Sequence, residues 1–101
     1  MTDTPLKARD ELDLGDNHRI TFTHFQGERR VAGGVEHLNP ATGTACTEWI
    51  PFEGRTWAKA FRDTITTWKV EQDDPLTLSP SILCRACGDH GFIRDGKWVR
   101  A

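Results

Sequence analysis

The sequence contains no long apolar segment. No stretch approaches the roughly 18 consecutive apolar residues that a membrane-spanning helix requires. The N-terminal stretch MTDTPLKARDELDLGDN is charged throughout and lacks the apolar core of a secretory signal peptide. These two absences argue against a membrane partner and against secretion. We therefore expect the chain to work in the cytoplasm, where thiols stay reduced.

The sequence has no large excess of positive or negative charge, and it contains few cysteines. The 13 Lys and Arg residues are interspersed with 15 Asp and Glu residues, and no basic block of the kind that binds phosphate backbones is present. Three cysteines are an odd number, which does not fit a closed disulfide framework. The chain also lacks a phosphate-binding loop, a nucleophile elbow and a dinucleotide-binding glycine pattern. A domain of 101 residues has a small core, so a further stabilising device is expected.

What is present is mainly a β-strand pattern. Threonine, aromatic and β-branched residues are enriched in segments that Gly, Pro and Asn turns separate. The segments expected to be extended are 18–25, 29–38, 46–52, 65–70 and 76–83. A short helix is expected at about 57–63, where apolar residues recur at helical spacing. The pair Gly33-Gly34 indicates a bulge or a close backbone approach.

The C-terminal segment has the clearest local signal. Asp95-Gly96 lies between two β-like runs, which predicts a β-hairpin over 90–100. Residues 1–17 are biased toward acidic side chains and are expected to form a flexible arm. The expected organisation is one small, metal-stabilised domain over 18–101. Its predicted class is mainly β, or small α+β, zinc-ribbon-like, with at most one short helix.

A pair of cysteines indicates metal binding. Cys84 and Cys87 have the C-x-x-C spacing at which two thiolates converge on one ion, and Gly88 tolerates the positive φ of such a turn. A redox pair would open a helix in a βαβ unit, whereas a hairpin follows here. Two buried, apolar cysteines are the other alternative. Metal binding fits the reduced compartment and the odd cysteine number best.

Tetrahedral zinc requires two further ligands. Cys46 is the expected third ligand, and for the fourth position His37 and His90 both stay open. Four of the following five residues are therefore expected to bind metal: Cys84, Cys87, Cys46, His37 and His90. Three thiolates donate so much charge that a bound water is poorly activated, so we expect a structural rather than a catalytic Zn²⁺. No catalytic residue is predicted.

A group of basic and aromatic side chains surrounds the cysteine pair and the hairpin. Its members are Arg85, Arg94, Lys97, Trp98 and Arg100. Such a group could contact an acidic protein or a nucleic acid, although four positive charges are a small footprint for a nucleic acid.

Two stretches resemble a family of short proteins encoded by tailed phages and prophages. The elements shared by 68–99 are Trp68, Asp74-Pro75, Leu78-Ser79-Pro80-Ser81-Ile82, Cys87, His90, Phe92-Ile93 and Asp95-Gly96. The stretch 34–52 is similar in a His, then a Cys, then an aromatic residue followed by Ile-Pro-Phe. Many family members carry an N-terminal Cys pair and a Cys directly followed by His, and here this chain departs from the pattern. The resemblance implies a phage origin and metal binding, and no particular activity.

We therefore expect a phage-encoded, zinc-binding protein of the bacterial cytoplasm that acts by binding a protein partner from the host or the phage. The balance of these observations is against an enzyme. Two alternatives stay open: a nucleic-acid-binding zinc module that uses the C-terminal hairpin, and a zinc-dependent hydrolase. The first predicts binding that weakens with salt, and the second requires a metal ion with an open water position.

Overall fold

The computed structural model describes residues 10–55, 58 and 65–101. The strands in these residues are β1 (Glu11–Gly15), β2 (His18–Phe25), β3 (Glu28–Leu38), β4 (Ala45–Pro51), β5 (Lys69–Asp73), β6 (Leu76–Ser79), β7 (Ile82–Leu83), β8 (His90–Arg94) and β9 (Lys97–Arg100). The protein is mainly β, as predicted. The helix predicted at 57–63 lies outside the described residues, apart from Ala58. The described part of the chain contains no helix that is long and apolar enough to cross a membrane.

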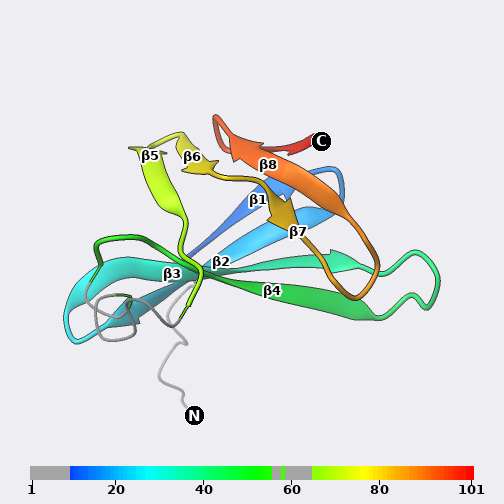
Figure 1. The fold of residues 1–101 in the computed structure, drawn as a ribbon, viewed down its shortest axis with the longest axis horizontal. Coiled ribbons are helices and arrows are strands. Elements are labelled where there is room, and N and C mark those ends of the chain that lie inside the picture. The colour runs from blue at the N-terminus through cyan, green and yellow to red at the C-terminus, as the bar shows by residue number, and fades with distance from the viewer. Residues whose placement is uncertain (1–9, 56–57, 59–64) are drawn as a thin grey trace, which may run out of the picture.

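The strands form three antiparallel sheets. β1 to β4 make a four-stranded sheet in chain order, β5 pairs with β6, and β7, β8 and β9 make a three-stranded sheet. Figure 1 shows the two smaller sheets lying over one face of the four-stranded sheet. The C-terminal part of the chain therefore packs on the N-terminal part, and this brings distant cysteines together.

The four-stranded sheet follows from an alternating sequence. In β2, Ile20 and Phe22 are buried, whereas the alternating residues Arg19, Thr21 and Thr23 are more exposed, so one face of the strand points to the core. Gly33 in β3 lies opposite Phe22, and a Cβ there would stand 2.5 Å from Cδ1 of Ile20. The pairing of β2 and β3 continues without a bulge across Gly33, so this glycine accommodates a close side-chain approach.

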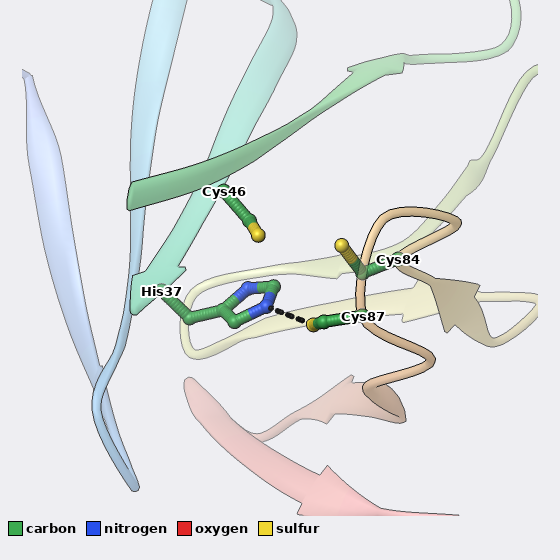
Figure 2. A group of neighbouring side chains, drawn as sticks. All are labelled: His37, Cys46, Cys84 and Cys87. Atoms are coloured by element: carbon green, nitrogen blue, oxygen red, sulfur yellow. Dashed lines mark hydrogen bonds between the residues drawn. The ribbon is translucent and has the colours of Figure 1, made fainter. Parts of the chain in front are cut away.

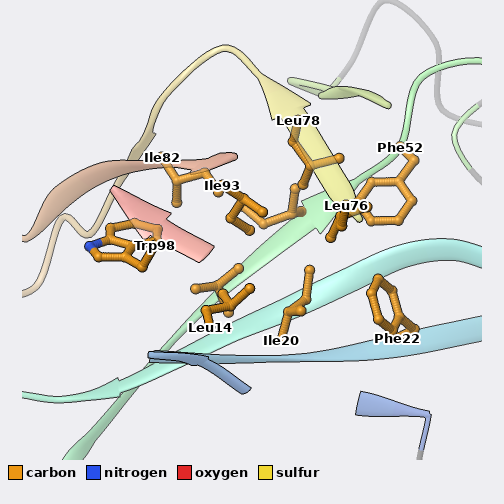
Figure 3. Packing of buried hydrophobic residues seen from close by; sticks show 11 residues of the cluster. Leu14, Ile20, Phe22, Phe52, Leu76, Leu78, Ile82, Ile93 and Trp98 are labelled. Carbon is orange, nitrogen blue, oxygen red and sulfur yellow. The ribbon is translucent and has the colours of Figure 1, made fainter. Parts of the chain in front are cut away.

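The core lies between the layers. Its members are Leu14, Ile20, Phe22, Val35, Ile50, Phe52, Leu76, Leu78, Ile82, Ile93 and Trp98. Figure 3 shows side chains of the four-stranded sheet pointing toward those of β6, β8 and β9. Each large apolar side chain that is fully buried contributes about 1.5–3 kcal/mol, so this shared core fixes the position of the C-terminal strands.

Part of the segment predicted to be a flexible acidic arm is a β-strand. Residues 11–15 form β1 and pair with β2, and Asp10 accepts a hydrogen bond from the backbone N–H of Phe22. The physical reason is that Leu12 and Leu14 alternate with the acidic residues, and Leu14 is buried in the core. The folded domain therefore begins before residue 18.

The C-terminal hairpin is confirmed. Arg94 pairs with Lys97, Ile93 with Trp98 and Phe92 with Val99, as the two-residue loop at Asp95-Gly96 predicts. Directly opposite residues share a face of the sheet. Ile93 and Trp98 face the core, whereas Val99 on the other face is exposed. The hairpin therefore has one buried and one open face.

Candidate functional site

Three thiols and one imidazole converge between the two layers. His37, Cys46, Cys84 and Cys87 each offer one ligand atom, and these four atoms all lie within 4.8 Å of one another. His37 and Cys46 are direct partners in β3 and β4, and Figure 2 shows both side chains pointing toward the loop of Cys84 and Cys87. The structure thus brings together four of the five predicted ligands.

The loop after β7, residues 84–89, has the geometry of the short turn that carries two metal-binding cysteines, and we call it the knuckle. The backbone N–H of Gly88 donates to the carbonyl of Cys84 over 2.7 Å, and the N–H of Cys84 donates to the carbonyl of Asp89 over 2.7 Å. Gly88 has a φ of 81°, a conformation that favours glycine. These bonds turn both cysteine side chains toward β3 and β4.

Three of the four donors are buried, and all four are close to one another. Nε2 of His37 lies 3.1 Å from Sγ of Cys87, and Cys46, Cys84 and His37 are buried. Burial, together with the neighbouring thiols of Cys84 and Cys87, raises the pKa of the Cys46 thiol to about 11. A divalent cation would favour the thiolate forms instead. Three sulfurs and one imidazole nitrogen are the donor set of a closed, structural zinc site, so the residues present fit the ion.

The ring of His18 stacks on that of His37, one of the four candidate ligands. Its ring stacks on Trp98 with centroids 4.0 Å apart and on His37 with centroids 5.0 Å apart. Its Nδ1 donates to the carbonyl of Asp16, and its Nε2 lies 2.6 Å from the Asp89 carboxylate. The sequence alone does not indicate this role of His18, because nothing in its spacing shows that β1 and β2 pass beside the knuckle.

His90, the fifth predicted ligand, has a different partner. Its Nε2 lies 2.8 Å from Oγ of Ser81, which directly precedes β7. The indole N–H of Trp68 donates to the carbonyl of Ser81 over 3.2 Å. Within the described ranges, no carboxylate is bonded to Nδ1 of His90. A serine hydroxyl in contact with a histidine is the arrangement of a nucleophile and its general base.

Ser81 was missed by the sequence reasoning. The nucleophile elbow was the only serine motif considered, and Ser81 does not lie in one. The signal available was the run Ser-Pro-Ser-Ile ahead of a histidine, which is part of the phage-family pattern. A serine and a histidine that follow each other in sequence do not by themselves indicate contact.

The predicted partner surface is divided by the fold. Arg85, Arg94 and Lys97 are exposed. Arg100 is exposed too, and its guanidinium donates to the Asp16 carboxylate over 2.7 Å. Trp98 is only 7% exposed and faces the core, so its inclusion in a partner surface is wrong. The reason is the alternation along β9, which turns Trp98 inward and Val99 outward.

Comparison with known proteins gives one family. A protein-family model described as bacterial ubiquitination-like system serine protease (BubE) matches residues 51–101. The match includes Ser81, His90 and both knuckle cysteines, and it begins after His37 and Cys46. Neither the curated proteins nor the solved structures contain a match.

The match corrects one expectation and shows the family of the chain. The expectation that the protein is not an enzyme is wrong, because the matching family is described as a serine protease family. The match extends over half of the chain. The chain therefore belongs to the family of bacterial ubiquitination-like system serine proteases (BubE).

Proposed function

We propose that this protein is a serine protease of a bacterial ubiquitination-like system, with Ser81 as the nucleophile and His90 as its general base. The observation that carries the proposal is the 2.8 Å contact between Oγ of Ser81 and Nε2 of His90. Both residues lie in the segment that matches the protease family. The pair is accessible to a substrate, because His90 is exposed.

The reaction uses the two side chains in turn. Nε2 of His90 takes the proton of the Ser81 hydroxyl while Oγ attacks the carbonyl carbon of the scissile bond. The tetrahedral intermediate collapses when His90 returns this proton to the leaving amine, and the acyl group stays on Ser81 as an ester. A water molecule then gives a proton to His90 and attacks the ester. The acid product leaves, and Ser81 recovers its proton from His90.

The fold holds the pair from both sides. Ile82 pairs with Gly91, and Leu83 pairs with His90, so the pairing of β7 with β8 holds Ser81, next to Ile82, and His90 on neighbouring segments. The bond from Trp68 fixes the carbonyl of Ser81. Catalysis of this type depends on the reacting groups being held in position before substrate binds.

The test is covalent labelling with a fluorophosphonate, which reacts with activated serine hydroxyls. We expect Ser81→Ala to abolish labelling and His90→Ala to slow it by about 10²–10⁴-fold, the usual contribution of a general base. Ser79→Ala is the matched control, because the Ser79 hydroxyl is bonded to Glu71 instead. Labelling of the Ser81→Ala protein at the wild-type rate would remove the basis of the proposal.

We also propose that His37, Cys46, Cys84 and Cys87 bind Zn²⁺ as a structural ion. Four protein donors leave no open position for a water molecule, which argues against the zinc-hydrolase alternative. Metal analysis distinguishes the two histidines. His37→Ala should lose zinc, whereas His90→Ala should keep zinc and show the slowed serine labelling described above. Loss of zinc from both variants, or from neither, would contradict this division.

The protein partner expected from the sequence is, in this proposal, the substrate protein. It binds at the face that carries Ser81 and His90. The phage origin and the cytoplasmic location stay predictions.

A further inference from the structure

The serine–histidine pair lies on the open face of the three-stranded sheet. Ile82, Ile93 and Trp98 point to the core, so the residues that alternate with them point outward. The outward side chains define what we call the dyad face: Ser81, Leu83, His90, Phe92, Arg94, Lys97 and Val99. The contact between Ser81 and His90 places both functional groups on this face.

Apolar side chains surround the pair on the dyad face. Leu83 lies directly opposite His90 and is 50% exposed. Phe92, two residues from His90 on the same side of β8, is half-buried and pairs with Val99, which is 39% exposed. Large apolar side chains that cluster on an exposed surface commonly mark a binding site. These three side chains flank the position at which a scissile bond must lie.

Positive charge is found at one end of the dyad face. Arg94 pairs with Lys97 beside the hairpin turn, and both are exposed. The guanidinium of Arg94 lies over the Phe92 ring, 4.2 Å from its centroid, which holds the charge against the dyad face. Among the residues that the structure describes, neither cation forms an ion pair. Both are therefore available to a carboxylate of a substrate.

We infer that the dyad face binds an extended segment of the substrate protein, with apolar side chains beside the scissile bond and an acidic residue toward Arg94 and Lys97. The inference rests on the proposed function and specifies its substrate class. A nucleic acid would also be attracted by the two cations. Two free cations are a small footprint for a phosphate backbone, however, and three apolar side chains favour a peptide.

The test is a matched set of fluorogenic peptides that differ only beside the scissile bond. One peptide carries Leu and Val there, a second carries Ser and Thr, and each is made with and without a Glu at the end expected to meet Arg94. We expect the wild-type kcat/KM to be about tenfold or more higher for the apolar peptide, the usual effect of hydrophobic contacts on specificity. The acidic residue should raise kcat/KM further, and added salt should reduce that increase.

Two variants and their controls test the residues. Leu83→Ser should reduce the preference for the apolar peptide, whereas Leu38→Ser, at the end of β3 with the same 50% exposure, should leave it unchanged. Arg94→Glu should reverse the preference for the acidic peptide, whereas Arg29→Glu in β3 should not. Melting temperatures of all four variants exclude loss of folding as the cause.

The outcomes separate this inference from the proposed function. Cleavage by the Ser81→Ala protein would overturn the proposed function itself. If the wild-type protein is labelled at Ser81 but cleaves all peptides equally, or cleaves and binds none of them, only the inference about the dyad face fails. It also fails if Leu83→Ser and Leu38→Ser behave alike. Salt-dependent binding of a single-stranded oligonucleotide that requires Arg94 would assign the face to a nucleic acid instead.

Discussion

Gly91 is the position at which the smallest change should disturb both the fold and the serine–histidine pair. It lies in β8 next to His90 and opposite Ile82. A Cβ at this position would stand 2.6 Å from Cε2 and Cζ2 of Trp98 and 2.7 Å from the carbonyl oxygen of Val99. The carbonyl belongs to the paired strand and cannot rotate away, and the Trp98 ring is stacked on His18. Overpacking of this kind costs about 1–3 kcal/mol.

We therefore expect Gly91→Ala to lower the melting temperature by about 4–8 °C for each kcal/mol, as is usual for a domain of about 100 residues. β8 must therefore shift relative to Trp98 and the Val99 carbonyl, and His90, the neighbour of Gly91, shifts with it, which disturbs its contact with Ser81. Labelling by the fluorophosphonate should fall together with stability.

Gly34→Ala is the matched control for this prediction. It makes the same substitution inside a strand, and its Cβ would meet only Cγ2 of Thr47, at an ordinary 3.5 Å. Circular dichroism melts and labelling rates of both variants provide the comparison. A Gly91→Ala protein that melts at or above the temperature of Gly34→Ala would show that the strands adapt without cost, and would refute the reasoning.

Three further changes have expected outcomes. Trp68→Phe keeps an aromatic ring but removes the hydrogen bond to the Ser81 carbonyl. The free energy of unfolding, measured by urea titration, should fall by about 0.5–1.5 kcal/mol, and fluorophosphonate labelling should slow. Chelation of the proposed zinc should lower the melting temperature, and readdition of Zn²⁺ should restore it, because metal binding is coupled to folding at such sites. The Arg30 guanidinium holds the pKa of the Asp10 carboxyl well below its usual range. That stabilisation is present above the carboxyl's unfolded pKa of about 3.9 and is lost as pH falls toward the much lower folded pKa, so Asp10→Asn should flatten the loss of stability in urea titrations below about pH 4.

The parts of the fold that were predicted from sequence depend on short-range signals. The hairpin needs only Asp95-Gly96 and its two flanking runs, and the knuckle needs only a cysteine spacing followed by Gly88. Such signals act within a few residues, so the rest of the chain does not alter them.

The parts that were not predicted depend on contacts between distant segments. Sequence spacing left His37 and His90 equal as ligands, because only the register of β3 against β4 places His37 opposite Cys46. The N-terminal arm was predicted from its acidic composition, although Leu12 and Leu14 have the alternation of a strand. Burial of Leu14 in the shared core outweighs the charge of its neighbours.

The alternation of side chains along β7 explains how one short segment serves two chemistries. Ile82 and Cys84 have the same parity and point inward, which takes Cys84 to the buried thiols and imidazole. Ser81 and Leu83 have the other parity and point outward. Because Leu83 pairs directly with His90, that histidine must share the outer face, where it reaches Ser81 and lies away from the proposed metal ligands. A shift of one residue in the pairing of β7 with β8 would turn His90 inward and destroy the pair. The proposed metal site and the proposed protease site are therefore separated by the register of a two-residue strand, and we expect loss of that register to remove activity even where zinc remains bound.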